Sequence, residues 1–206
     1  MGLAGVILAA GESTRMGRDK ALLRWPPDGN DSSAGTLLST AVAAFSIFCD
    51  LVIVVTGKNE AALAPVIYAT GAFLARNPSP DRGQFSSIQT GLRETLNHGR
   101  DRAIVTLVDR PPPRAATLEQ LVTAFTAKAR DIWSVVPEYA GKHGHPIVVG
   151  REMIEEFLKA PFSATAREVE HANQAHICYL PVDDPFVITN INTPEDYASL
   201  QSGFSR

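Results

Sequence analysis

The sequence is poor in several features that define particular classes of protein. It has only two cysteines among 206 residues, Cys49 and Cys178, and both stand next to apolar residues. We expect both thiols to be reduced and buried, which favours a reducing compartment and therefore the cytoplasm. No apolar run is long enough to span a bilayer. The apolar residues 1–10 lack a basic segment, so we predict a core strand there and not a signal peptide.

The sequence also lacks an excess of positive charge. It has 19 Lys and Arg against 22 Asp and Glu, which gives a net charge of −3. Surfaces that bind nucleic acid usually need a basic excess, so we expect neither nucleic acid nor a membrane as a partner. A local basic cluster that holds phosphate is still compatible with this composition. The hydrophobic fraction of 45% is typical of a globular protein, and the length suits one domain over residues 1–206.

Short apolar runs alternate along the chain with longer helical patterns. We predict strands at residues 3–9, 51–56, 72–75, 103–108, 132–136, 146–149, 177–182 and 187–189. We predict helices at residues 37–48, 60–70, 85–96, 117–129, 153–158, 164–172 and 194–200. Pro65 lies inside the second of these helices and is a residue type that breaks helices. The alternation predicts an α/β fold with a Rossmann-like, mostly parallel sheet and helices on both faces. Residues 25–35 are polar and rich in Pro, Gly, Asp and Ser, so we expect a loop.

The segment that follows the first predicted strand has the composition of a phosphate-binding loop. Residues 8–20 read Leu-Ala-Ala-Gly-Glu-Ser-Thr-Arg-Met-Gly-Arg-Asp-Lys. Small residues at 9–11 allow a ligand to approach the backbone, whose N–H groups can bind an anion. Arg15, Arg18 and Lys20 place three cations within six residues. The segment matches neither the P-loop nor the dinucleotide motif, and a turn with solvated basic side chains is the alternative interpretation.

This segment resembles the signature of nucleotidyltransferases related to molybdenum cofactor guanylyl- and cytidylyltransferases. Four further segments resemble that family in the expected order, so the resemblance extends over nearly the whole chain. They are Gly-Gln-Phe-Ser-Ser-Ile-Gln-Thr-Gly-Leu at 83–92, Leu-Val-Asp-Arg-Pro at 107–111, Gly-Lys-His-Gly-His-Pro at 141–146 and Asn-Ile-Asn-Thr-Pro-Glu-Asp at 190–196.

The resemblance implies transfer of a nucleotide from a triphosphate to a phosphorylated acceptor, with release of pyrophosphate. The acceptor it implies is the molybdopterin cofactor, and a molybdoenzyme that receives the product is a further implied partner. Nucleotide binding is expected from Leu8, Ala9, Ala10, Gly11, Ser13, Arg15, Lys20, Ser86 and Ser87. Catalysis is expected from Arg15, Lys20 and Asp109, with Mg²⁺ held by Asp109 and Asn192 and the acceptor held by His145 and Asn190.

The choice of base follows from features that point in two directions. Within the family, Ala9-Ala10 and the Gly-His-Pro segment are associated with CTP, which makes CMP transfer the first expectation. Asn190 and Asn192 stand where the cytidylyltransferase branch usually has Asp, and in this respect the chain resembles the guanylyltransferase branch. Asn is also a weaker ligand than a carboxylate for a hard cation. GTP therefore remains an alternative, as does a sugar or alditol phosphate acceptor, or a nucleotide- or cofactor-binding protein without catalytic activity.

Several of these residues also have a purely structural interpretation. Asp109 could cap a turn, and Ser86 or Ser87 could cap a helix. Thr193-Pro194 is a strong helix start by itself, so a catalytic role for the two asparagines would be additional. His143 and His145 alternate on an extended segment and should face opposite sides. For His145 a structural role and an acceptor-binding role both remain open.

Overall fold

The structure, a computed structural model, describes residues 2–13, 16–27 and 34–204. Its centre is one eight-stranded sheet in the order β10-β7-β9-β6-β1-β4-β5, with the short β8 paired to the end of β7. The strands are β1 (Leu3–Leu8), β4 (Leu51–Thr56), β5 (Phe73–Arg76), β6 (Arg102–Leu107), β7 (Ser134–Tyr139), β8 (Lys142–His143), β9 (Ile147–Gly150) and β10 (Ile177–Pro181). The pairs β5–β4, β4–β1, β1–β6 and β7–β10 are parallel, whereas β9 runs antiparallel to β6 and β7. The predicted mostly parallel α/β sheet is confirmed.

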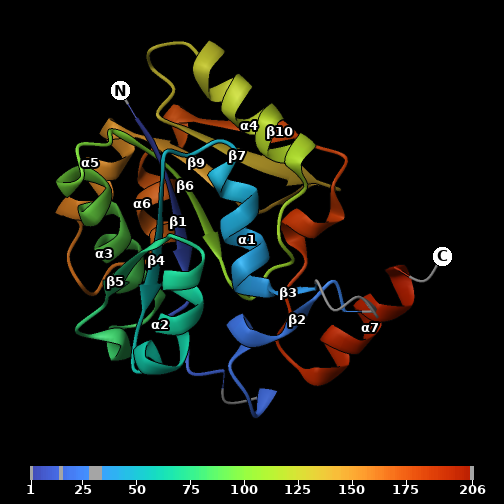
Figure 1. Cartoon of the computed structure of the whole chain (residues 1–206). Helices are drawn as coiled ribbons and strands as arrows, with labels where there is room; N and C mark the ends of the chain where they lie inside the picture. Colours follow the sequence, from blue (N-terminus) through green and yellow to red (C-terminus); the bar gives the residue numbers. More distant parts are fainter. Residues whose placement is uncertain (1, 14–15, 28–33, 205–206) are drawn as a thin grey trace.

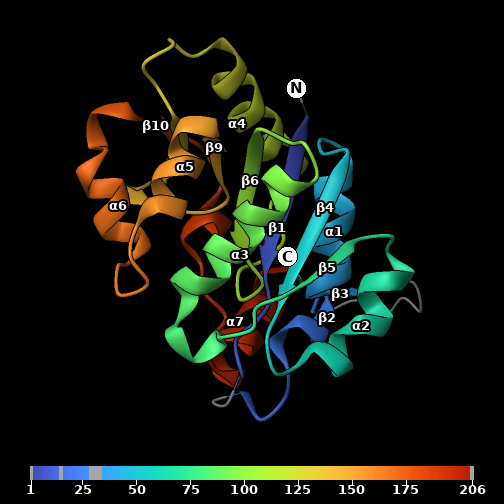
Figure 2. The same cartoon turned by 90° about the vertical axis from the view of Figure 1, so that its left-hand side faces the viewer.

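Helices cover both faces of this sheet (Figures 1 and 2). One face packs against α3 (Gln84–Asn97), α5 (Arg151–Lys159) and α6 (Ala166–Ala172). The other packs against α1 (Leu37–Ser46), α2 (Glu60–Ala69) and α4 (Ala115–Ala127). In β1, Val6 and Leu8 face the first layer, and Ile7 faces the second. Because the strand is buried on both sides, its sequence is continuously apolar.

A third apolar cluster attaches the last helix to the segment that follows the phosphate loop. Helix α7 (Pro194–Phe204) contributes Tyr197, which packs with Leu23, Trp25, Leu37 and Ile191. The Tyr197 hydroxyl donates a hydrogen bond of 2.6 Å to the carbonyl of Arg24. In Figure 1, α7 accordingly lies beside the two-stranded ribbon formed by β2 (Arg24–Trp25) and β3 (Gly35–Thr36). The segment after the phosphate loop is thereby packed against the C-terminal motif and the helix that follows it.

Two local expectations were wrong. Residues 187–189 are not a strand, because Pro185–Ile188 form a 3₁₀ helix capped by the Asp184 side chain, which accepts from the Phe186 N–H. The helix predicted at residues 60–70 is confirmed as α2, which continues through Pro65 without interruption. Trp25 and Gly35, predicted as ends of a loop, pair with each other in the β2–β3 ribbon; residues 28–33 of that loop lie outside the described part of the chain.

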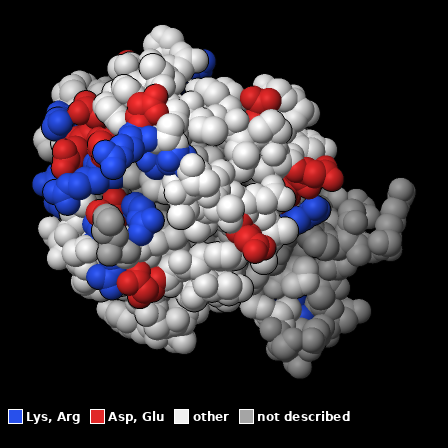
Figure 3. Space-filling view, turned by 90° about the horizontal axis from the view of Figure 1, so that it is seen from above, with Lys and Arg blue, Asp and Glu red and all other residues white. Residues whose placement is uncertain are grey.

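Charged side chains gather at the end of the sheet where the parallel strands begin. Figure 3 views the molecule from this end and shows basic and acidic side chains intermixed. Arg100, which precedes β6, pairs with Asp50 at 2.9 Å, and Arg102 lies 3.6 Å from Asp101. The positive charge here is therefore largely matched by neighbouring carboxylates. Both cysteines are free thiols, and no helix among the described residues is long and apolar enough to cross a membrane.

Gly91 lets α3 approach the centre of the sheet. A Cβ added at this position would lie 2.4 Å from Cγ1 of Val6 and 3.0 Å from Cγ2 of Val55. Both valines are fully buried, so they have no room to move aside. We predict that Gly91→Ala lowers the free energy of unfolding by about 1–3 kcal/mol, despite the higher helix propensity of alanine. Urea unfolding of this variant and of the exposed Arg93→Ala on the same helix checks the prediction, and equal stability of the two would contradict it.

Candidate functional site

The order of the strands places a crevice beside β1. The chain passes from β1 to β4 and β5 on one side and then returns to β6 on the other. The loops that follow β1 and β6 therefore diverge, and in open α/β sheets ligands bind at such a point, beyond the carboxyl ends of the strands. The Val108 N–H donates to the Leu8 carbonyl at 3.0 Å, which keeps the two loops together at their bases.

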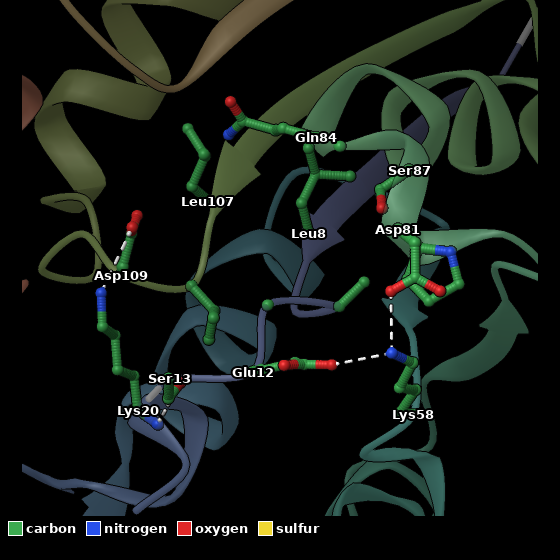
Figure 4. Close-up of a pocket in the computed structure, with 15 residues that line it drawn as sticks. Leu8, Glu12, Ser13, Lys20, Lys58, Asp81, Gln84, Ser87, Leu107 and Asp109 are labelled. Carbon is green, nitrogen blue, oxygen red and sulfur yellow. Dashed lines mark hydrogen bonds and ion pairs between the residues drawn. The ribbon is translucent and has the colours of Figure 1, made fainter. Parts of the chain in front are cut away.

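A cavity of about 490 Å³ lies at this point, and we call it the first cavity (Figure 4). The phosphate loop contributes Leu8, Ala10, Gly11, Ser13 and Lys20 to its wall. Helix α3 contributes Ser87, and the turn after β6 contributes Asp109. These seven residues, all expected at the site, are therefore brought together. Arg15 lies outside the described residues, and Arg18 is exposed and does not line this cavity.

The backbone of the phosphate loop is held by Asn59, a residue that the sequence did not single out. Its Nδ2 donates to the Ala9 carbonyl at 2.8 Å and to Asp19 Oδ2 at 2.6 Å. Its Oδ1 accepts from the Gly57 N–H at 3.1 Å. The side chain of Ala9 is buried in the core and does not line the cavity. Ala9 therefore contributes to the site through its carbonyl, which anchors the loop backbone to Asn59.

Lys20 connects the three ligand-facing segments of the site. Its Nζ lies 3.6 Å from Asp109 Oδ2 and donates to Asn192 Oδ1 at 3.1 Å. Its backbone N–H donates to the Ser13 hydroxyl at 3.1 Å. Next to these contacts the Ile191 N–H donates to the Asp109 carbonyl at 2.7 Å. The C-terminal motif therefore lies against the turn after β6, and Figure 4 shows Lys20 pointing across the cavity toward Asp109.

The donors around Asp109 suit a hard divalent cation. Its Oδ1 is shielded from solvent and has no hydrogen-bond partner among the described residues, so one oxygen is left for a ligand. Asn192 adds a neutral oxygen, because its Oδ1 accepts from the same Lys20 Nζ that faces Asp109. No group of three or more His, Cys, Asp or Glu side chains in the described chain could hold a metal alone. Mg²⁺ is commonly bound by one or two carboxylates together with substrate phosphates, and these residues fit that pattern.

The opposite edge of the first cavity carries a charged bridge that sequence reasoning missed. Lys58, in the loop after β4, lies 3.0 Å from Glu12 Oε1 and 2.7 Å from Asp81 Oδ1 (Figure 4). Hydrogen bonds to Asp81, and next to Glu12, raise the pKa of Lys58. The bridge joins the phosphate loop to the turn that precedes α3. Nothing in the local sequence indicated it, because the three residues are far apart in the chain.

Ser86 and Ser87 do not cap a helix. The N-cap of α3 is Gly83, and both hydroxyls instead accept from Asn77 Nδ2, at 2.8 Å and 3.0 Å. The Ser86 hydroxyl donates to the Gly83 carbonyl at 2.7 Å. Ser87 lines the first cavity, whereas Ser86 does not. Ser86 therefore supports the turn that precedes α3.

His143 and His145 face different surroundings, as the alternation predicts. His143 is exposed, stacks on Tyr179 with ring centroids 3.8 Å apart, and lies 3.4 Å from Glu138. His145 lines a second cavity, of about 280 Å³, which shares Leu8, Gln84 and Leu107 with the first. Burial, together with the nearby charge of Arg110, lowers the pKa of His145 to about 3. Asn190 is exposed and lines neither cavity.

A phosphate loop facing a carboxylate at the switch point of a parallel sheet defines a nucleotide-binding α/β protein. Residues 5–177 match the family model described as MobA-like NTP transferase domain. That match covers most of the 206 residues, so the chain belongs to this family of nucleotidyltransferases.

Relatives named as guanylyltransferases and as a cytidylyltransferase align over almost the full chain. One, from Mycobacterium avium (strain 104), is named "Probable molybdenum cofactor guanylyltransferase" and is 29% identical over 97% of this chain and 95% of its own. Another, from Escherichia coli (strain K12), is named "Molybdenum cofactor cytidylyltransferase" and is 24% identical over 97% and 96%. The crystal structure of Rv0371c from Mycobacterium tuberculosis H37Rv superposes with a TM-score of 0.80 at 23% identity, covering 98% of each chain. A further structure of Rv0371c is a complex with manganese, a divalent metal.

Asn59 provides a direct test of how the phosphate loop is held. We predict that Asn59→Asp, which cannot donate to Ala9 or Asp19 and adds a charge beside Asp19, lowers the free energy of unfolding by about 1–3 kcal/mol. The affinity for magnesium nucleotide, measured by calorimetry, should fall as well. The control is Asn97→Asp, whose side chain is exposed and contacts only Glu94 among described residues. Unchanged stability and affinity in Asn59→Asp would count against this role of Asn59.

The low pKa of His145 predicts a pH dependence of stability. The unfolded chain takes up a proton on this residue below about pH 6.5, whereas the folded chain does so only near 3. The free energy of unfolding should therefore fall as pH falls through this window, by about 2 kcal/mol from His145 alone between pH 7 and pH 5. His145→Gln should lose less stability over that range than wild type in denaturant titrations. Parallel pH profiles for the two proteins would refute the assignment.

Proposed function

We propose that the protein transfers CMP from CTP to the terminal phosphate of molybdopterin and releases pyrophosphate, as a single domain over residues 1–206. The observation that carries this proposal is the position of Lys20, whose ammonium group faces Asp109 and Asn192 across the first cavity. Ala10 and Gly11 of the phosphate loop line the same cavity. The second cavity also has a cation and a carboxylate, Arg167 and Glu170, but only Leu8 of the phosphate loop lines it.

The chemistry needs positioning and charge neutralisation more than proton transfer. A phosphate oxygen of the acceptor attacks the α-phosphorus of CTP, a new P–O bond forms, and the bond to the β-phosphate oxygen breaks. Because the attacking oxygen is already anionic, no side chain has to remove a proton. Lys20 would neutralise charge on the phosphates as pyrophosphate leaves, an effect worth several kcal/mol in a partly buried site. Arg15 is proposed to assist as a second cation.

Mg²⁺ is the proposed metal, held by Asp109 with Asn192 beside it. When bound, it would neutralise phosphate oxygens and help to orient the triphosphate. The free Oδ1 of Asp109 supports this assignment. Asn192 would serve chiefly to position Lys20, because its Oδ1 already accepts from Nζ.

Both cavities and their shared wall support a two-substrate reaction. Ser13 and Ser87 face the first cavity, which we assign to the triphosphate, and His145 faces the second, which we assign to the acceptor. A neutral imidazole can donate a hydrogen bond to an uncharged part of the acceptor, or accept one from it. Asn190, at the exposed start of the C-terminal motif, is proposed to contact the acceptor at the mouth of the site.

The base remains a choice between CTP and GTP, since relatives of both names match this chain. Ala9-Ala10 favours CTP, whereas the asparagines at 190 and 192 favour GTP. Calorimetry with each nucleotide, with and without Mg²⁺, separates these two. Metal-independent binding without turnover would instead favour a non-catalytic binding protein. Pyrophosphate release with sugar, alditol or molybdopterin phosphates as acceptor distinguishes the remaining alternatives. This function implies that the protein works in the cytoplasm and that a molybdoenzyme receives its product.

Removing the charge of Lys20 should separate catalysis from folding. We predict that Lys20→Met lowers kcat for pyrophosphate release by about 10²–10³-fold. Asp109→Asn should weaken the dependence on Mg²⁺ and lower kcat to a similar extent. Lys142→Met, at an exposed position of β8, is the control and should leave kcat unchanged. Full activity of Lys20→Met with the true acceptor would overturn the proposed mechanism.

A further inference from the structure

The second cavity lies on the face of the sheet that α3, α5 and α6 cover, and it adjoins the first. The two share Leu8, Gln84 and Leu107, and Figure 4 shows Gln84 lying at the edge of the first cavity next to Leu107. A molecule in the second cavity would therefore lie next to the cavity that Asp109 lines. At about 280 Å³ it is near the lower end of the usual range for small-molecule sites.

Most of the second cavity's wall is apolar and suits a flat ring. Ile88 and Leu92 from α3, Ile147 from β9 and Phe157 from α5 are all buried and face it. Its only acidic side chain among the described residues is Glu170, in the last turn of α6. A carboxylate beside such a wall can orient a ring that also packs against apolar side chains.

No described residue pairs with the Glu170 carboxylate in a way that would explain its position. Its side chain is partly buried, and no described residue forms a hydrogen bond or ion pair with the carboxylate. Arg167 lines the same cavity one turn earlier on α6, yet it makes no ion pair with Glu170. Burial raises the pKa of Glu170, and no cation counteracts this. The charge of Glu170 also contributes, after burial, to the raised pKa of Tyr179.

The helix does not need this carboxylate either. The other acid of α6, Glu168, forms the capping box with Thr165 and thereby completes the start of the helix. The carboxylate oxygens of Glu170 are open to solvent and therefore accessible to a ligand, and partly buried carboxylates with a raised pKa are common at binding sites. Glu170 therefore has the features of a group whose hydrogen-bond partner arrives with the ligand.

We propose that Glu170 determines acceptor specificity by binding the pterin ring through its 2-amino group and N3–H. These two donors lie side by side on one edge of a pterin, and a carboxylate can accept both at once. The ring would lie against the apolar wall, and the phosphate-bearing side chain would extend past the shared wall toward Asp109. This inference rests on the proposed function, because it takes the acceptor to be a pterin.

The first test replaces Glu170 by glutamine, which keeps the size of the side chain but presents one donor and one acceptor. We expect the KM for molybdopterin to rise about 10–100-fold, as for loss of hydrogen bonds to a charged group. The kcat and the calorimetric affinity for magnesium CTP should stay at wild-type values. The matched control is Glu119→Gln on α4, at an exposed position on the opposite face of the sheet. An active Glu170→Gln enzyme with an unchanged KM would overturn the proposal.

The second test needs no turnover and therefore separates this proposal from the proposed function. The probes are pterin and lumazine, which differ in that lumazine carries a carbonyl where pterin carries the 2-amino group. Fluorescence titration should show that wild type and Glu119→Gln prefer pterin by about tenfold or more. Glu170→Gln should lose or reverse this preference, because its amide can donate to the lumazine carbonyl. If Glu170 had only a structural role, Glu170→Gln would weaken the binding of pterin and of lumazine to the same extent.

The outcomes of the two tests lead to different conclusions. No pterin binding to wild type, or an equal preference in wild type and Glu170→Gln, overturns the role of Glu170 whatever the enzyme's turnover. If pterin binds through Glu170 but wild type releases no pyrophosphate with CTP or GTP and molybdopterin, the proposed function fails while the ring-binding role stands.

Discussion

The placement of one ammonium group determines the arrangement of the site. Lys20 Nζ lies between Asp109 and Asn192, and these three residues come from three separate motifs of the chain. A partly buried lysine is costly to leave unpaired, so its contacts favour one arrangement of the phosphate loop, the turn after β6 and the C-terminal motif. The same charge is what a triphosphate would require at this position. Folding thus prepares the positive side of the cavity before any nucleotide binds.

The remainder of the fold holds this arrangement in place. The sheet sets the directions of the loops after β1 and β6, because both strands are central, parallel and fully covered by helices. Asn59 anchors the phosphate loop through the Ala9 carbonyl. The hydrogen bond from Tyr197 to the Arg24 carbonyl attaches α7 to the segment that follows the phosphate loop. Each of these contacts joins residues that are distant in sequence. The precision of the site therefore depends on tertiary packing, and local propensity contributes little to it.

The sequence predicted the elements whose physical cause is local. Continuous apolar runs predicted the buried strands, and Thr193-Pro194 predicted the start of α7, where Asp196 accepts from the N–H groups of Asn192 and Thr193. The failures arose where a distant contact decides the conformation. The backbone of residues 185–188 forms a 3₁₀ turn, and the Val187 carbonyl accepts from Arg110 and from the His145 N–H. Neither partner is visible from the segment 187–189 itself, which has the composition of a strand.

The same distinction explains which site residues the sequence could indicate. Lys20 and Asp109 follow strands in recognisable motifs, so the family resemblance identified both. Asn59, Lys58 and Glu170 stand in segments without a motif, and only the packed chain shows what each one faces. Asn59 and Lys58 already have side-chain partners within the protein, whereas no described residue forms a hydrogen bond or ion pair with the Glu170 carboxylate. An acidic group that the fold partly buries and leaves without a donor differs physically from its neighbours, and a ligand that brings two N–H groups would remove that difference.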